Sequence, residues 1–197
     1  MLSPKTKVAI YLIPFFILIL SCDNIFAQNM SWHSNGPFLE LNFAVITYFH
    51  SDPNIMLAGD NGVLYRSEDA GETWEYQCFY EGTISTIEID PFLENVIYIS
   101  TTSGLYKSED YGKTWTKTEL DVGTINTIAI DKNNISVIYA GAGNGGTTSG
   151  TTGIFKSSDG GGTWTKIYSE QIDGVYKIII DHSNSSTIYA SIGSYYY

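Results

Sequence analysis

The feature of this sequence that most restricts its fold is an eight-residue pattern, Ser-x-Asp-x-Gly-x-Thr-Trp, which occurs three times. We call the three copies box segments: residues 67–74, 108–115 and 157–164. Successive copies start 41 and 49 residues apart, and the extra eight residues fall in a Gly/Thr-rich stretch, residues 141–153. Repetition at this period indicates several copies of one structural unit.

The residues between the box segments repeat as well. A segment rich in Ile and Tyr occurs three times, at residues 83–100, 124–141 and 175–191. A shorter version of the same segment occurs at residues 43–59. Alternating apolar residues and turn residues in the second unit predict four strands, at residues 83–90, 95–100, 104–109 and 114–119. No helical period is visible after residue 27, so the chain is predicted to be all-β, and each unit has the size of a propeller blade.

The box segments resemble the Asp box, or BNR repeat, at every defined position. Over about residues 43–193 the chain is similar to Asp-box β-propellers, which include sortilin-like proteins, photosystem II assembly factors, xyloglucanases and sialidases. The resemblance implies a β-propeller of four-stranded antiparallel blades, but little about function, because these families do unrelated things on one scaffold.

Only part of a propeller is expected, with three complete blades and half of a fourth. The predicted units are a signal peptide at 1–27, an N-terminal segment at 28–42 that could supply a closing strand, and blades at 43–82, 83–123, 124–174 (with the Gly/Thr-rich insertion) and 175–197. We expect a truncated product of a longer propeller, and the alternative is self-association that completes the ring.

The chemistry of the box segments predicts a structural joint, because their carboxylates can accept backbone hydrogen bonds within a turn and their glycines allow positive φ. Repeated tyrosines, among them Tyr98, Tyr139 and Tyr189, are expected in the blade core. The residues assigned this structural role in the boxes are Ser67, Asp69, Gly71, Thr73, Trp74, Ser108, Asp110, Gly112, Thr114, Trp115, Ser157, Asp159, Gly161, Thr163 and Trp164.

A ligand is expected at the opposite end of the blades, where the turns between second and third strands meet the crossings between blades, because these segments differ between units. This loop face is acidic and would favour a basic peptide, a cation or a neutral polar ligand. Its candidate residues are Asp60, Asn61, Tyr80, Glu81, Asp121, Asn144, Glu170 and Asp173.

The sequence gives little support to the hypothesis that the chain is an enzyme. Propeller sialidases hold a carboxylate with three arginines, whereas this chain contains only Arg66, which excludes that mechanism. A xyloglucanase-like fragment is the alternative, with Asp60 as one catalytic carboxylate, although inverting hydrolysis needs a second carboxylate across the bond. The three histidines lack metal-ligand spacing, so neither a metal nor a cofactor is expected.

The first 27 residues have two lysines before an apolar run and a small residue at Ala27, which is the layout of a secretory signal. The alternative is a lipid anchor on Cys22. Without residues 1–27, which hold two lysines and one aspartate, the net charge changes from −11 to −12. This charge disfavours nucleic acid. The sequence thus predicts an extracytoplasmic, non-catalytic module that binds protein or carbohydrate, without a transmembrane span in the mature chain.

Overall fold

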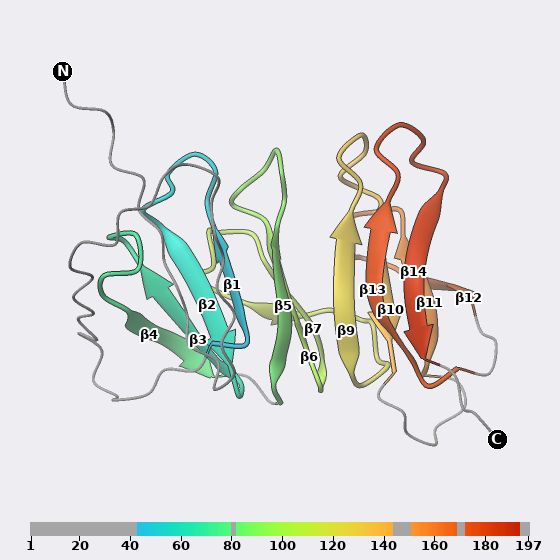
Figure 1. Cartoon of the computed structure of the whole chain (residues 1–197), viewed down its shortest axis with the longest axis horizontal. Coiled ribbons are helices and arrows are strands. Elements are labelled where there is room, and N and C mark those ends of the chain that lie inside the picture. Colours follow the sequence, from blue (N-terminus) through green and yellow to red (C-terminus); the bar gives the residue numbers. More distant parts are fainter. Residues whose placement is uncertain (1–42, 80–81, 144–150, 169–171, 194–197) are drawn as a thin grey trace, which may run out of the picture.

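The structure, a computed structural model, describes residues 43–79, 82–143, 151–168 and 172–193, and within these ranges all regular elements are strands. The signal-like segment 1–27, the expected closing strand in 28–42 and most of the Gly/Thr-rich insertion lie outside the described residues. The strands form four antiparallel sheets that follow one another in chain order across Figure 1.

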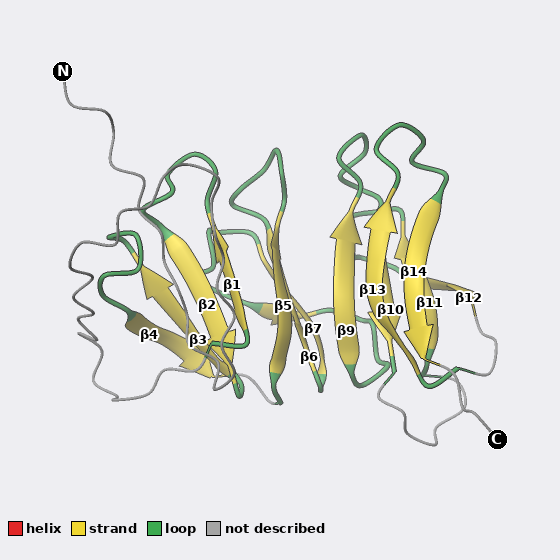
Figure 2. Cartoon of the chain, in the orientation of Figure 1, coloured by secondary structure: helices red, strands yellow, loops and turns green. Residues whose placement is uncertain are grey.

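Three of the sheets have four strands, and each is a meander in which neighbours in sequence are neighbours in space (Figure 2). The first sheet contains β1 (Val45–Tyr48), β2 (Met56–Asp60), β3 (Val63–Ser67) and β4 (Glu75–Phe79). The second contains β5 (Ile84–Ile89), β6 (Ile97–Thr101), β7 (Gly104–Ser108) and β8 (Thr116–Lys117). The third contains β9 (Ile125–Ile130), β10 (Ile138–Ala142), β11 (Gly153–Ser157) and β12 (Thr165–Tyr168). The fourth sheet has two described strands, β13 (Gly174–Ile180) and β14 (Ile188–Gly193).

The core lies between the faces of consecutive sheets. Leu57 and Leu64 of the first sheet pack with Ile87 and Ile99 of the second, and similar clusters of Ile, Leu and Tyr join the second sheet to the third and the third to the fourth. Because neighbouring sheets bury side chains against one another, each middle sheet needs a sheet on both faces.

The outer strand of the second sheet, β8, is only two residues long. β8 pairs with β7 through only two residue pairs, and the chain then leaves the sheet. Leu120 and Val122 in the following crossing are buried in the core between the second and third sheets. Their burial draws the crossing inward and ends the strand at Lys117.

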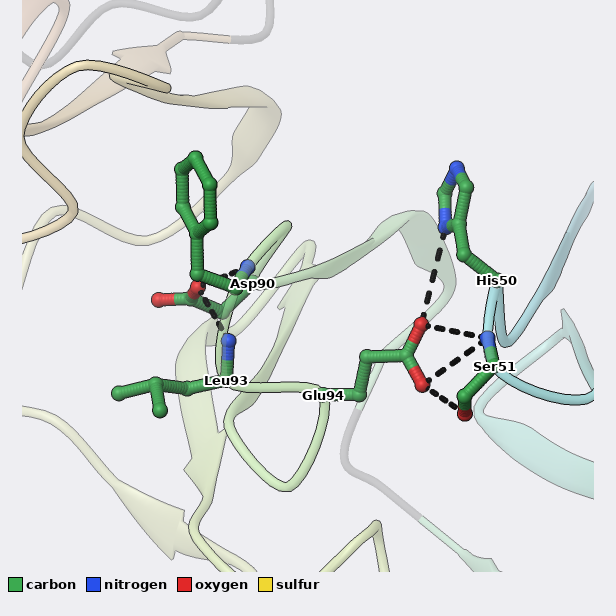
Figure 3. A network of polar contacts seen from close by, with 6 residues as sticks. His50, Ser51, Asp90, Leu93 and Glu94 are labelled. Atoms are coloured by element: carbon green, nitrogen blue, oxygen red, sulfur yellow. Dashed lines mark hydrogen bonds and ion pairs between the residues drawn. The ribbon is translucent and has the colours of Figure 1, made fainter.

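The turns between first and second strands also join neighbouring sheets. Glu94, after β5, accepts hydrogen bonds from the backbone nitrogen of Ser51 at 3.0 and 3.3 Å and from its hydroxyl, and His50 Nδ1 lies 3.9 Å from its carboxylate (Figure 3). In the same view Asp90 accepts bonds of 2.9 Å from the backbone nitrogens of Phe92 and Leu93. Burial of Glu94 acts to raise its pKa, but the Ser51 bonds and the His50 charge outweigh it, so its pKa is lowered.

The expectation for the repeated tyrosines is right at two positions and wrong at one. Tyr98 and Tyr139 are buried in the core, whereas Tyr189 of β14 is exposed. The physical reason is that sheets following them cover Tyr98 and Tyr139, while no described sheet follows β13–β14.

Candidate functional site

Each box segment forms a closed set of hydrogen bonds around its aspartate. Asp110 Oδ1 accepts bonds of 2.8 Å from the Ser108 hydroxyl and from the Thr114 backbone nitrogen, and Oδ2 accepts one of 2.6 Å from the Thr114 hydroxyl. The bonds around Asp69 and Asp159 are the same, with lengths of 2.6 to 2.8 Å. Both oxygens of each carboxylate therefore have partners within their own turn.

These bonds favour the charged form of the aspartates. The hydroxyl and then the backbone of Thr114 lower the pKa of Asp110 to about 2, and the backbone and then the hydroxyl of Thr163 do the same for Asp159. The pKa of Asp69 is also lowered, chiefly by Thr73. A carboxylate with so low a pKa is a poor proton donor at neutral pH, which argues against general acid chemistry in the boxes.

The backbone of the boxes explains their glycines. In the second box Tyr111 and Gly112 have φ of 64° and 80°, so two consecutive residues are left-handed. A Cβ at Gly112 would lie 3.2 Å from the Trp115 ring, whose Nε1 donates a 3.0 Å bond to the Gly112 carbonyl. Position 112 therefore needs a residue without a side chain.

Each of the last two boxes also contacts the sheet before it. The Tyr98 hydroxyl of the second sheet donates a 2.9 Å bond to the carbonyl of Gly160 in the third box. Arg66 Nη1 of the first sheet donates a 3.2 Å bond to the carbonyl of Tyr111, which holds the same place in the second box. The second and third box segments thus lie at the junctions between sheets.

At the second of these junctions lies a cleft of about 490 Å³. One wall comes from β7, the second box, β8 and the start of the following crossing, and the other comes from the third box. The residues that line it are Lys107, Glu109, Asp110, Thr114, Thr116, Lys117, Thr118, Glu119, Asp159, Gly160, Gly161 and Gly162.

Charges of both signs line the cleft, with carboxylates in excess. Lys107 Nζ lies 2.7 Å from Glu109 Oε1 and 5.8 Å from the centroid of the Tyr98 ring. Burial, helped by nearby carboxylates that include Glu109 and Asp159, raises the pKa of Tyr98, so its hydroxyl remains a neutral hydrogen-bond donor. The residues that line the cleft can offer threonine hydroxyls, backbone groups and carboxylates to a polar ligand.

Four of the eight candidates for the loop face lie among the described residues. Asp60 is the last residue of β2 and Asn61 begins the β2–β3 turn, where Asn61 and Gly62 have φ of 39° and 83° and Asn61 Nδ2 donates a 3.0 Å bond to Asp60 Oδ2. This Asn-Gly pair fits a tight hairpin turn, which accounts for both residues locally. Tyr80, Glu81, Asn144 and Glu170 lie outside the described residues.

The other two described candidates are in crossings between sheets. Asp121 is exposed, and Asp173 is partly buried with one buried carboxylate oxygen, Oδ1, that has no hydrogen-bond partner. Neither residue lines the cleft, and neither does Asp60. Binding at the loop face stays a prediction.

The sequence analysis did not single out the cleft as a ligand site. Its walls come from two boxes 49 residues apart, and their proximity depends on how the two sheets pack. The one signal in the sequence is the run of threonines at 114, 116 and 118, whose alternation places three small polar side chains on one side of an edge strand.

Among residues that the structure describes, no group of three or more His, Cys, Asp and Glu side chains is placed to hold a metal ion. The same residues include no helix long and apolar enough to span a membrane.

A family profile described as Sortilin-Vps10 (sortilin, neurotensin receptor 3) matches residues 62–192, which is more than half of the chain. The chain belongs to the Sortilin-Vps10 family. The resemblance to sortilin-like propellers that the box segments suggested is thereby confirmed. No curated protein matches this Sortilin-Vps10 chain.

Solved structures with the same fold are β-propellers. An ancestral GH74 enzyme is 23% identical with a TM-score of 0.63, over 74% of this chain and 21% of its own. YCF48 bound to D1 peptide is 18% identical with a TM-score of 0.52, over 70% of this chain and 44% of its own. YCF48 from Cyanidioschyzon merolae is 21% identical with a TM-score of 0.50, over 68% and 41%. The predicted all-β propeller fold is confirmed, and the chain spans less than half the length of these structures.

Proposed function

We propose that this chain is a non-catalytic, extracytoplasmic binding module that holds an extended polypeptide segment in the cleft between its second and third sheets. The observation that carries the proposal is that the cleft runs beside β8, the outer strand of the second sheet, which pairs with β7 alone.

An outer strand has backbone N–H and C=O groups on its free side that can pair with an added strand. Thr116 and Lys117 form β8, and both line the cleft. The opposite wall consists of Asp159 and Gly160 to Gly162, so a single side chain projects from it and most of the space beside it stays open. A polypeptide in extended form therefore fits the shape and the hydrogen-bonding groups of the cleft better than a compact ligand.

The charge of the cleft favours a basic segment. Glu109 and Glu119 are exposed carboxylates on its lining, and Asp110 and Asp159 add two further negative charges, against Lys107 and Lys117. The whole chain has a net charge of −11. A ligand rich in Lys or Arg is attracted by this field, while phosphate backbones are repelled.

Two further observations support the proposal. One protein with a similar fold was solved as YCF48 bound to D1 peptide. The signal-like layout of residues 1–27 is the basis for the extracytoplasmic part. The alternative of a glycoside hydrolase fragment rests on Asp60, which is the last residue of β2 and does not line the cleft.

A binding titration tests the proposal. The probe is a fluorescent twelve-residue peptide of alternating Lys and Val, added to the full chain at low ionic strength. We expect saturable binding that Glu119→Lys weakens about tenfold, because it reverses a charge on the cleft. The matched control is Glu75→Lys, which reverses an exposed carboxylate on β4 outside the cleft. Equal weakening by the two variants, or no binding, would refute the proposed site.

A further inference from the structure

The free edge of β8 presents the backbone of one residue. The Thr118 nitrogen donates a 2.8 Å bond to the Leu105 carbonyl, and Thr116 is the cross-strand partner of Lys107. In an antiparallel pair the hydrogen-bonded positions alternate, so the backbone of Thr116 and Thr118 faces β7, whereas the N–H and C=O of Lys117 point away from it. Lys117 is therefore the residue of β8 to which an added strand can hydrogen-bond.

The two sides of β8 have different surroundings. The side chain of Lys117 passes over Gly104, where a Cβ would lie 2.7 Å from Lys117 Cε. Tyr106, the cross-strand partner of Lys117, packs against the core between the first and second sheets. Thr116 and its partner Lys107 lie on the other side and line the cleft. One side of β8 thus has the Lys117 cation, and the other side faces the acidic cleft.

The backbone does not require a glycine at position 160 in the opposite wall. Gly160 has φ of 69°, and the residues at the same place in the other two boxes, Ala70 and Tyr111, have φ of 58° and 64°. The Gly160 nitrogen donates a 2.9 Å bond to the Ser136 carbonyl, and its own carbonyl accepts the bond from Tyr98. What Gly160 contributes to the cleft is therefore the space that a side chain would fill.

We propose that the cleft selects extended segments in which Lys or Arg alternates with uncharged residues. This inference rests on the proposed function and names the pattern that the bound segment must have. The residue of the segment opposite Lys117 places its side chain on the Lys117 side of the sheet, where a second cation is repelled. The two neighbours of that residue point to the other side, toward the acidic cleft lining and the space beside Gly160.

The first test compares the Lys/Val peptide of the binding titration, KVKVKVKVKVKV, with a block peptide of the same composition and charge, KKVVKKVVKKVV. An extended strand of the Lys/Val peptide has all its lysines on one side, whereas the block peptide divides them equally between the two sides. We expect the Lys/Val peptide to bind the full chain at least about tenfold more tightly. Equal affinities would overturn the selection of an alternating pattern.

The second test fills the space at Gly160. Gly160→Tyr introduces the residue that the second box has at this place with nearly the same φ, and it should weaken binding of the Lys/Val peptide at least about tenfold. Ala70→Tyr is the matched control, because it adds the same side chain at the same place of the first box, which does not line the cleft. It should leave binding unchanged. Equal effects of the two variants would overturn the role of this space.

The third test removes the N–H of Lys117. Lys117→Pro keeps the bonds between β7 and β8, because proline is tolerated where the N–H of an edge strand faces outward. We expect binding of the Lys/Val peptide to weaken at least about fivefold, although loss of the lysine charge alone would strengthen binding of a cationic peptide. Unchanged or tighter binding would overturn the proposed pairing.

The two peptides also separate failure of this inference from failure of the proposed function. If neither peptide binds the parent chain, both are refuted. If both bind with equal affinity and Glu119→Lys weakens both, the cleft remains the binding site and the alternating pattern is wrong.

Discussion

The Tyr98 hydroxyl donates a 2.9 Å hydrogen bond to the Gly160 carbonyl and so joins the second sheet to the box of the third. At the preceding junction the equivalent box carbonyl, that of Tyr111, accepts a bond from Arg66 instead. A phenol and a guanidinium therefore make the same connection at successive junctions. We infer that the box segments act as joints between sheets as well as turns within them.

Removal of the Tyr98 hydroxyl tests this joint. Tyr98→Phe keeps the buried ring but leaves the Gly160 carbonyl without this donor, so we expect the free energy of unfolding to fall by about 1 kcal/mol. Urea unfolding measures the change. Tyr76→Phe is the control, because Tyr76 is 61% exposed on β4; an equal loss there would show that the Gly160 bond contributes nothing specific.

Ser108 should contribute more to the free energy of unfolding than an exposed serine does. Its side chain is buried, and its Oγ accepts a 2.9 Å bond from the backbone nitrogen of Gly112. Ser108→Ala leaves that buried N–H unsatisfied, which should cost about 2 kcal/mol in urea unfolding. Ser158→Ala, at an exposed position of the third box, should stay within about 0.5 kcal/mol of the parent. A Ser108 variant as stable as the Ser158 variant would contradict the account of the box.

The boxes should make stability depend on pH in the acid range. The folded-state pKa of Asp110 and Asp159 is about 2, below the usual 3.8, so the unfolded chain binds protons first as the pH falls. Their contribution is therefore complete above about pH 4 and is lost as the pH falls toward 2. Melting temperatures measured across this range should fall less steeply in Asp110→Asn than in the parent; an unchanged profile would argue against the Thr114 bonds.

The ionised form of Glu88 in β5 should destabilise the fold, in contrast to the ionised aspartates of the boxes. Burial raises its pKa, although the charges of Lys177 and Lys132 partly oppose this. For an acid with a raised folded-state pKa, ionisation opposes folding, so Glu88→Gln should raise the free energy of unfolding at pH 7 and lose this advantage below about pH 4. Chemical unfolding at pH 7 and pH 3 compares the two conditions. A variant less stable than the parent at pH 7 would show that attraction by the charges of Lys177 and Lys132 outweighs the cost of burying the Glu88 carboxylate.

Strand positions were readable from sequence because they depend on local alternation. The second unit was predicted to have strands at 83–90, 95–100, 104–109 and 114–119, and the structure has Ile84–Ile89, Ile97–Thr101, Gly104–Ser108 and Thr116–Lys117. Only the last is much shorter than expected. The difference comes from Leu120 and Val122, whose burial between sheets is a non-local effect.

The contacts between neighbouring sheets could not be predicted from local alternation. The local pattern does not distinguish Tyr98, which contacts the next box, from Tyr189, which is exposed, because the two occupy the same place in the repeat. The cleft depends in turn on the angle at which two boxes meet across a junction. Local patterns predict the strands and turns, whereas a site shared by two sheets requires their packing.

Hydrogen–deuterium exchange of the full chain with and without the Lys/Val peptide tests the central claim most directly. Strand addition to β8 should slow exchange of backbone amides in residues 107–119 and 159–162. Residues 60–62 and 121–123, on the loop face, should exchange at the same rate in both states. Protection confined to the loop face, or protection nowhere, would contradict the assignment of the cleft as the binding site.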